Sequence, residues 1–177
     1  MERPTIRMIG IAGWSGAGKT TLLARLIPEL IRRGARVSTL KHAHHAFDVD
    51  HPGKDSHAHR LAGASEVLIS SRNRFALLHE LRGEEEWTLP HLLARLAPVD
   101  FVLVEGFKRE THPKIEVFRA ANGKPPLHPE DPMVVAIAAD APFPDTTLPQ
   151  AGLDDIERIA DFVERFARPV ASVFPPT

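Results

Sequence analysis

Residues 13–21, GWSGAGKTT, lie between the apolar run IRMIGIA (residues 6–12) and a leucine-rich stretch that begins at Leu22. The spacing G-x-x-x-x-G-K-[ST], in which backbone N–H groups surround a phosphate, is met by Gly13, Gly18, Lys19 and Thr20. Residues 6–12 are typical of a buried strand, and apolar residues recur at helical spacing from Leu22 to Ile31. A strand, a glycine-rich loop and a helix in this order predict a phosphate-binding loop.

The far end of this loop has predicted chemical roles. Lys19 is expected to reach the β and γ phosphates of a nucleotide, and Thr20 to offer its hydroxyl to Mg²⁺. The N-terminal end of the following helix adds a partial positive charge. The alternative is a glycine-rich turn with a solvated lysine, which the flanking strand and helix disfavour. The predicted phosphate-binding residues are Gly13, Ser15, Gly16, Ala17, Gly18, Lys19, Thr20 and Thr21.

The composition argues against several classes of function. The 22 basic and 23 acidic side chains give a formal charge of −1, so no global field attracts nucleic acid or an anionic membrane. The chain contains no cysteine, which excludes disulfides, thiolate zinc sites and cysteine-held iron–sulfur clusters. Its apolar runs are too short to span a bilayer, and its start, MERPTIR, is unlike a signal peptide. We therefore expect a cytoplasmic protein without membrane or nucleic-acid partners.

Predicted strands and helices alternate along the chain. This alternation predicts an α/β fold with a doubly wound, mostly parallel sheet, and 177 residues suit a single domain over 1–177. The runs 65–70 and 74–81 predict an antiparallel hairpin, an insertion at about residues 66–80. The tail 169–177 is expected to be poorly packed. Other strands are expected at 35–43, 99–106, 114–120 and 133–140, and helices at 22–31, 52–64, 84–98 and 153–167.

Two acidic residues flank the apolar run 101–104. In open α/β sheets, ligands bind beyond the carboxyl ends of the strands. Asp100 begins the predicted strand and Glu105 ends it, and five steps of about 3.3 Å separate them by roughly 16 Å. Glu105 is therefore the predicted catalytic residue, which binds Mg²⁺ or positions water, although acids at strand ends also occur by chance. Gly106 is expected to allow a close approach of the backbone to the γ-phosphate.

The loop KHAHHAFDVDHPGKDSHAH, residues 41–59, follows the second predicted strand and is expected near the same edge of the sheet. Asp50 and Asp55 are predicted to hold Mg²⁺ through water, and Lys54 to meet a phosphate or an acidic partner. Six of the ten histidines lie in this loop, a density that also fits a transition-metal site. We favour ordinary surface histidines, because there is no cysteine and no clear ligand geometry.

The residues alone do not identify the base of the nucleotide. The Asn-Lys-x-Asp run with which many GTPases recognise guanine is absent from the sequence. Asp140 ends the run VVAIAAD and could accept hydrogen bonds from a guanine edge, but an aspartate that caps a loop is an equal alternative.

Four blocks together closely resemble the MobB family, adapter proteins in molybdopterin guanine dinucleotide biosynthesis. They are GWSGAGKTTL (13–22), KHAHHAFDVDHPGKDSHAHRLAGA (41–64), DFVLVEGFKRETHPKIEVFR (100–119) and VVAIAADAP (134–142). The resemblance implies a P-loop NTPase fold, binding of GTP and Mg²⁺, homodimerisation, and work beside the guanylyltransferase that attaches GMP to molybdopterin. It places nucleotide contacts on Gly16, Gly18, Lys19, Thr20 and Thr21, and acidic site residues at Asp50, Asp55 and Glu105.

Three function classes remain open. The resemblance favours a GTP-binding adapter that delivers nucleotide or the molybdopterin cofactor to the guanylyltransferase, with weak GTPase activity at most, because Glu105 alone is placed to position water. The second class is a metallochaperone-type NTPase that uses the histidine-rich loop. The third is a small-molecule kinase, for which residues 82–87, RGEEEW, supply no obvious lid.

Overall fold

The computed structural model describes residues 5–43 and 47–175. The chain divides into two compact units, each treated by itself. The main unit comprises Met1–His42 and Leu89–Thr177, and the insert unit comprises Ala43–Thr88. The assignment of the whole chain to one domain stays a prediction beside this division.

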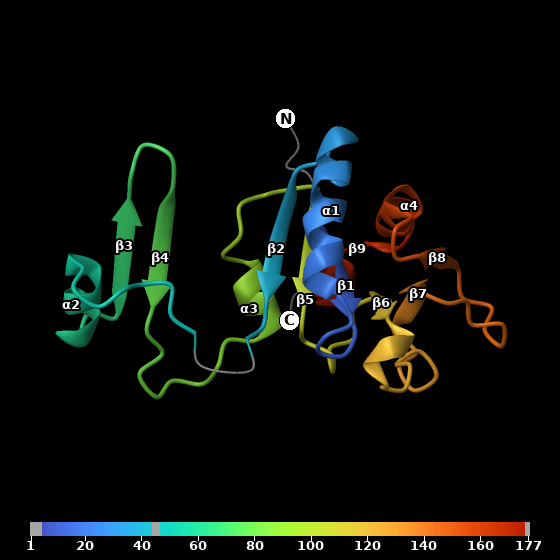
Figure 1. Ribbon diagram of the computed structural model, residues 1–177. Coiled ribbons are helices and arrows are strands. Elements are labelled where there is room, and N and C mark those ends of the chain that lie inside the picture. Colours follow the sequence, from blue (N-terminus) through green and yellow to red (C-terminus); the bar gives the residue numbers. More distant parts are fainter. Residues whose placement is uncertain (1–4, 44–46, 176–177) are drawn as a thin grey trace. The chain divides into compact units, whose positions relative to one another are not determined.

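The main unit is built on a parallel sheet (Figure 1). The strand order is β2-β5-β1-β6-β7-β8, and each neighbouring pair is parallel. A short strand, β9, pairs antiparallel with the start of β1. The mostly parallel α/β fold predicted from the sequence is therefore confirmed. The bounds are β1 Arg7–Ala12, β2 Val37–Lys41, β5 Phe101–Glu105, β6 Lys114–Phe118, β7 Val134–Ala139, β8 Gln150–Gly152 and β9 Arg168–Pro169.

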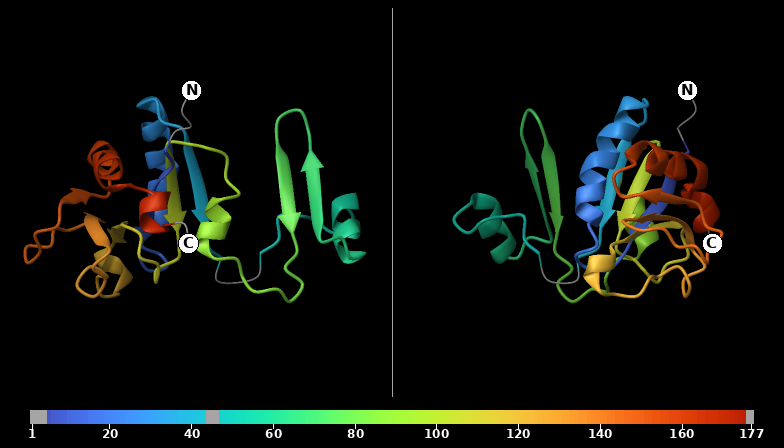
Figure 2. Two further views of the ribbon diagram at one scale, coloured as in Figure 1. Left: turned by 180° about the vertical axis from the view of Figure 1, so that it is seen from behind. Right: turned by 45° about the vertical axis from the view of Figure 1, so that its right-hand side comes forward.

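Side chains alternate between the two faces of this sheet, and both faces are apolar, as expected for parallel strands covered on both sides. On one face Ile9 and Ile11 of β1 pack in a core with α1 (Lys19–Arg32) and α4 (Ile156–Phe166). On the other face Met8 of β1 packs with α3 (Leu89–Leu93) and with residues of α5 (Val170–Val173). The view from behind in Figure 2 shows α5, in red, on the side of the sheet away from α1.

The chain after α4 is packed, up to the last described residues. Val170, Val173 and Phe174 lie against the core that contains Met8, and the N–H group of Val170 donates to the carbonyl oxygen of Ile6. The expectation of a poorly packed tail was therefore wrong for residues 169–174. The few apolar residues of PVASVF, which follow a single proline, showed no periodicity from which this packing could be predicted.

On the face of β6 and β7 opposite α1 and α4, loop residues rather than helical ones pack against the sheet. Phe143 and Leu148 contact the buried side chains of Ile137 and Ala139. The loop that follows β6 contains the short 3₁₀ helix η1 (Ala120–Asn122). This part of the main unit contains the cavities described below.

Two charged residues on the same face of β6 are unusual for a core, because Lys114 and Glu116 are both about 1% exposed. Lys114 Nζ donates to the carbonyl oxygen of Glu110 at 2.7 Å and to Asp131 Oδ2 at 3.1 Å. Neighbouring His112 is fully buried, and neither of its ring nitrogens has a hydrogen-bond partner among the described residues. Burial, and then the charge of Lys114, lower the pKa of His112 to about 4.

The insert unit contains α2 (Asp55–Leu61) and an antiparallel pair, β3 (Glu66–Ser70) and β4 (Phe75–His79). The predicted hairpin is therefore confirmed, with a turn closed by the N–H group of Ser71 and the carbonyl oxygen of Arg74. Val67 is buried, whereas Leu68, its cross-strand partner Leu77, and Phe75 are exposed. One face of the ribbon is thus apolar and open.

In the described parts of the chain, no helix has the length and apolar character needed to cross a membrane.

Replacing Gly10, in the middle of β1, tests how tightly the buried side chains of His112 and Lys114 pack against this strand. A Cβ atom at this position would lie 2.5 Å from Nε2 of His112 and 2.9 Å from Cγ of Lys114, two buried side chains with little room to move. We expect Gly10→Ala to reduce the free energy of unfolding by about 1–3 kcal/mol, as overpacking does. Urea denaturation followed by circular dichroism measures this change.

Gly152→Ala is the matched control, because a Cβ atom there would meet no described atom within 4 Å. Its free energy of unfolding should stay within about 0.5 kcal/mol of wild type. Equal stability of the Gly10→Ala variant and wild type would contradict the tight packing of His112 against β1.

Candidate functional site

The predicted phosphate loop lies at the carboxyl end of β1. Gly13, Gly16 and Gly18 have φ angles of 148°, 82° and 97°, a region that other residues rarely adopt. A Cβ atom at Gly13 would lie 2.4 Å from the carbonyl oxygen of Val117 in β6. The loop therefore needs glycine at this position both for its conformation and for its packing. Gly18 directly precedes α1, which begins at Lys19.

Lys19 crosses the mouth of the loop. Its Nζ atom donates to the carbonyl oxygens of Gly13, at 3.0 Å, and of Trp14, at 3.1 Å. Burial is the largest cause that lowers the pKa of this lysine. The two carbonyl groups are neutral dipoles. An anion bound in the loop would give the Lys19 ammonium group a partner with a full negative charge.

The neighbourhood of Lys19 contains further charges of both signs. The nearby ammonium groups of Lys108 and Lys41 also lower the pKa of Lys19, whereas the carboxylate of Glu105 raises it. Glu105 Oε2 lies 3.8 Å from Lys41 Nζ, and the Glu105 side chain is 14% exposed. Three lysines around one partly buried acid form a site with surplus positive charge, which favours a polyanion such as a triphosphate.

Asp100 and Glu105 lie at opposite ends of the same strand region, as the sequence indicated. Glu105 is paired in register with Ile11 of β1 and Lys41 of β2, so it lies at the carboxyl ends of three parallel strands. Asp100 precedes β5 and accepts hydrogen bonds from the backbone N–H of Arg36, at 2.7 Å, and from its Nε, at 3.3 Å. The backbone hydrogen bond from Arg36, then the side-chain one, hold the pKa of Asp100 below its usual range. Only Glu105 is near the phosphate loop, although its role in metal binding stays a prediction.

The two residues after Glu105 form a sharp turn. Gly106 has a φ angle of 94°, and a Cβ atom there would lie 2.7 Å from Cβ of His42. Phe107 has a φ angle of 49°, and its ring lies 4.9 Å from that of His42. The close neighbour that the structure shows at Gly106 is thus His42. Its predicted approach to the γ-phosphate is not tested.

Segment 119–128 forms hydrogen bonds with residues of the phosphate loop. Asn122 Nδ2 donates to the carbonyl oxygen of Ser15 at 2.9 Å, and Trp14 Nε1 donates to that of Pro125 at 2.8 Å. The ammonium group of Lys108 lies 4.6 Å from the centre of the Trp14 ring. Sequence reasoning did not find these contacts, because they join residues about a hundred positions apart and no motif spacing contains them.

Asp140 lies just beyond the carboxyl end of β7 and performs the loop-capping role that was one of its two alternatives. Its two carboxylate oxygens accept from the backbone N–H of Ala120 at 2.9 and 3.2 Å. It also lines a cavity of about 260 Å³ at the carboxyl ends of β7 and β8. The other lining residues are Ala139, Ala141, Pro142, Gln150, Ala151 and Gly152. A carboxylate can hold more than one donor, so contact with a base in this cavity stays a prediction.

Asp50 and Asp55 lie in the insert unit, whereas Thr20 and Glu105 lie in the main unit. Asp50 accepts hydrogen bonds from Ser56 Oγ at 2.9 Å, the N–H of His51 at 3.0 Å and Arg60 Nε at 3.3 Å. Burial raises the pKa of Asp50, but these hydrogen bonds and the charge of Arg60 outweigh it and hold the pKa below its usual value. These contacts stabilise the start of α2, of which Asp55 is the first residue. Their roles as magnesium ligands are not tested.

The histidine-rich loop is described only in part. Among residues 5–43 and 47–175, no group of three or more histidine, aspartate or glutamate side chains converges in a way that could hold a metal ion. His44 and His45 lie outside the described residues. The metallochaperone alternative therefore stays a prediction.

The comparison with protein families decides the membership of this chain. The family described as molybdopterin guanine dinucleotide synthesis protein B, or MobB, matches residues 8–140. The chain belongs to the MobB family. The matched segment contains the phosphate loop, Glu105 and Asp140, and also the insert unit.

Individual proteins agree with this membership. The chain is 44% identical over 161 residues to the molybdopterin-guanine dinucleotide biosynthesis adapter protein of Escherichia coli, covering 89% of this chain and 91% of that one. It is 43% identical to the Haemophilus influenzae protein of the same name, covering 91% and 89% of the two chains. A crystal structure of molybdopterin-guanine biosynthesis protein B matches with a TM-score of 0.71 and 28% identity, over 89% of this chain and 98% of the other.

The two acids at the ends of β5 yield a direct test of the site. Glu105→Gln removes a charge near Lys19 but keeps the size of the side chain, so we expect Mg²⁺ to tighten GTP binding about tenfold less than in wild type. Titration calorimetry with GTP, with and without magnesium, measures the difference.

Asp100→Asn is the matched control, because it also neutralises one acid, but at the residue just before β5, at the strand's other end. Its magnesium-dependent affinity should stay within about twofold of wild type. Equal losses in both variants, or a wild-type response in Glu105→Gln, would remove Glu105 from the metal site.

Proposed function

We propose that this MobB protein is a GTP-binding adapter that assists the guanylyltransferase converting molybdopterin to molybdopterin guanine dinucleotide. The observation that carries the proposal is the arrangement of Lys19 across the glycine loop with Glu105 at the neighbouring strand end. The names of the Escherichia coli and Haemophilus influenzae relatives support the pathway. Such an adapter would work in the cytoplasm.

GTP would occupy the main unit with its phosphates on the loop and its base toward β7 and β8. The loop N–H groups and Lys19 would hold the phosphates, while Thr20 and Glu105 would hold Mg²⁺. The cavity beside Asp140 has room for part of a purine, and the carboxylate offers acceptors to the N–H groups of guanine. This placement agrees with the rule that ligands bind beyond the carboxyl ends of parallel strands.

Hydrolysis would be slow at most. In-line attack needs a group that positions water against the γ-phosphate. Glu105 is the acid whose charge raises the pKa of Lys19, and it is also the proposed magnesium ligand. One carboxylate serving both roles fits a nucleotide-controlled binding protein better than a fast enzyme.

The guanylyltransferase is the proposed partner, and the experiment is nucleotide-dependent binding. Purified protein and guanylyltransferase should associate more tightly with GTP and Mg²⁺ than without nucleotide, as measured by biolayer interferometry. Lys19→Ala should lose the nucleotide dependence, because the ammonium group that pairs with the phosphates is gone. Its fold should survive, since the hydrogen bonds that the Lys19 ammonium group makes to described residues go to the loop.

Lys124→Ala is the control, because Lys124 is exposed on segment 119–128 and makes no contact that the proposal uses. It should behave as wild type. No association with the guanylyltransferase in any nucleotide state would refute the adapter role, and retained dependence in Lys19→Ala would refute the phosphate-loop assignment.

The insert unit supports the proposal of a homodimer. Leu68, Leu77 and Phe75 are 61%, 47% and 73% exposed on one face of a ribbon of only two strands. Such a ribbon is marginally stable alone, and an apolar face of this kind gains from a second copy of itself. A symmetric contact uses the same patch on both subunits.

Replacing both Leu68 and Leu77 by serine removes the centre of this face. We expect a dimeric wild type and a monomeric double variant in light scattering at micromolar concentration, since each buried leucine contributes about 1.5–3 kcal/mol. Ile31→Ser is the control, because Ile31 is 55% exposed but lies on α1 of the main unit. A monomeric wild type, or a dimeric double variant, would contradict the proposed interface.

A further inference from the structure

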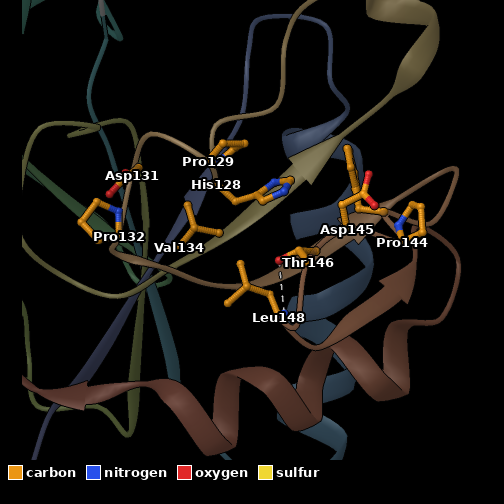
Figure 3. Close-up of a pocket in the computed structure, with 10 residues that line it drawn as sticks. His128, Pro129, Asp131, Pro132, Val134, Pro144, Asp145, Thr146 and Leu148 are labelled. Atoms are coloured by element: carbon orange, nitrogen blue, oxygen red, sulfur yellow. Dashed lines mark hydrogen bonds between the residues drawn. The ribbon is translucent and has the colours of Figure 1, made fainter.

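A larger cavity, of about 520 Å³, lies in the main unit beside the loops that cover β6 and β7 (Figure 3). It is apart from the phosphate loop, since none of residues 13–21 lines it. Its volume is in the range of small-molecule sites. The lining residues are His128, Pro129, Asp131, Pro132, Val134, Phe143, Pro144, Asp145, Thr146 and Leu148.

His128 presents a defined hydrogen-bond acceptor to this cavity. Its side chain is 9% exposed, and its Nδ1 atom lies 2.8 Å from Oε2 of Glu116, which is 1% exposed. The Glu116 carboxylate already accepts the backbone N–H groups of Leu127, at 2.5 Å, and of His128, at 3.0 Å. Because an ionised carboxylate only accepts, Nδ1 of His128 donates to it, and in the tautomer that carries its proton on Nδ1 the other ring nitrogen, Nε2, is left as an acceptor.

The remaining polar groups that line the cavity can form hydrogen bonds with a ligand that carries N–H donors. Asp145 is exposed at the mouth of the cavity, and both of its oxygens can accept. Thr146 Oγ1 accepts from the N–H of Leu148 at 3.3 Å, so its O–H proton can be donated to a ligand. Asp131 contributes less, because it is already paired with Lys114 and with the N–H of Met133.

The charge and the walls of the cavity further limit the class of ligand that it can bind. None of the ten lining residues is lysine or arginine, and two are aspartates, so a phosphate group would be repelled. The walls are flat or apolar, and the Phe143 ring stands edge-on to that of His128 with 4.9 Å between centres. In the view of Figure 3, the His128 ring lies above the side chains of Val134 and Thr146. A planar ring between such walls is held by dispersion and by its edge contacts.

We infer that this cavity binds a planar nitrogen heterocycle with a 2-amino-4-oxo edge, the group shared by guanine and pterins. Its adjacent ring N–H and amino groups match the Asp145 carboxylate, and its carbonyl oxygen matches the Thr146 hydroxyl. His128 Nε2 accepts a further N–H group. The choice between the two sources rests on the proposed function, but the binding chemistry does not.

The experiment uses heterocycles that carry no phosphate, so that the phosphate loop does not contribute. Titration calorimetry of the whole chain compares pterin with lumazine, and guanosine with inosine, since lumazine and inosine lack the 2-amino group. We expect at least one 2-amino compound to bind, and its partner without this group to bind about tenfold or more weakly, as for a lost buried hydrogen bond. Binding of pterin alone identifies the molybdopterin ring as the ligand, and binding of guanosine alone identifies guanine.

Variants locate the binding. Asp145→Asn should weaken the bound compound about tenfold. His128→Asn should do the same, because asparagine can still donate to Glu116 but does not replace Nε2. Glu130→Gln is the matched control, since Glu130 is exposed beside His128 but does not line the cavity, and it should leave the affinity unchanged.

Lys19→Ala separates this proposal from the proposed function. Heterocycle binding should persist in this variant while GTP binding is lost, and failure of GTP to bind wild type would refute only the nucleotide assignment. No heterocycle binding at millimolar concentration, wild-type affinity in Asp145→Asn, or loss of binding in Lys19→Ala would overturn the cavity assignment. Asp145 is exposed, so its variant tests the cavity even if His128→Asn fails to fold.

Discussion

The contact between Gly13 and β6 determines how the rest of the main unit is arranged. The carbonyl oxygen of Val117 lies 2.4 Å from where a Cβ atom of residue 13 would be, so the phosphate loop can leave β1 only as bare backbone pressed against β6. The pairing of Gly10–Ala12 with Lys114–Glu116 brings the two strands into this position. A glycine is needed here for contact with protein, in addition to any need set by a phosphate.

From this contact a chain of interactions runs across the unit. The loop is tied to segment 119–128 by Asn122 and Pro125, and Glu116 binds the far end of that segment through Leu127 and His128. The ten residues of this segment therefore border the phosphate loop at one end and the larger cavity at the other. The segment includes the short 3₁₀ helix η1, whose last residue is Asn122, so the link between the loop and His128 runs through this helix.

Local patterns were enough to predict most of the fold and part of the site. The apolar run 101–104 with an acid at each end indicated a buried parallel strand and placed Glu105, not Asp100, beside the loop, because strand direction follows from the βα alternation. The ribbon of β3 and β4 followed from two β-rich runs around a polar turn. Contacts that depend on tertiary structure could not be read in this way. Arg60 donates a hydrogen bond to Asp50, ten positions earlier in the sequence. Residues of α5, near the end of the sequence, pack against the core that contains Met8, near its start.

The chain has two tryptophans, and they fall one in each unit: Trp14 in the phosphate loop and Trp87 beside His79, with ring centres 4.5 Å apart. The indole of Trp14 is held by the carbonyl oxygen of Pro125 and faces the ammonium group of Lys108, so its surroundings are polar and charged. Tyrosine is absent from the sequence, and the fluorescence of the protein therefore comes almost wholly from these two rings. With Trp87 changed to phenylalanine, the emission spectrum becomes an optical record of the loop alone.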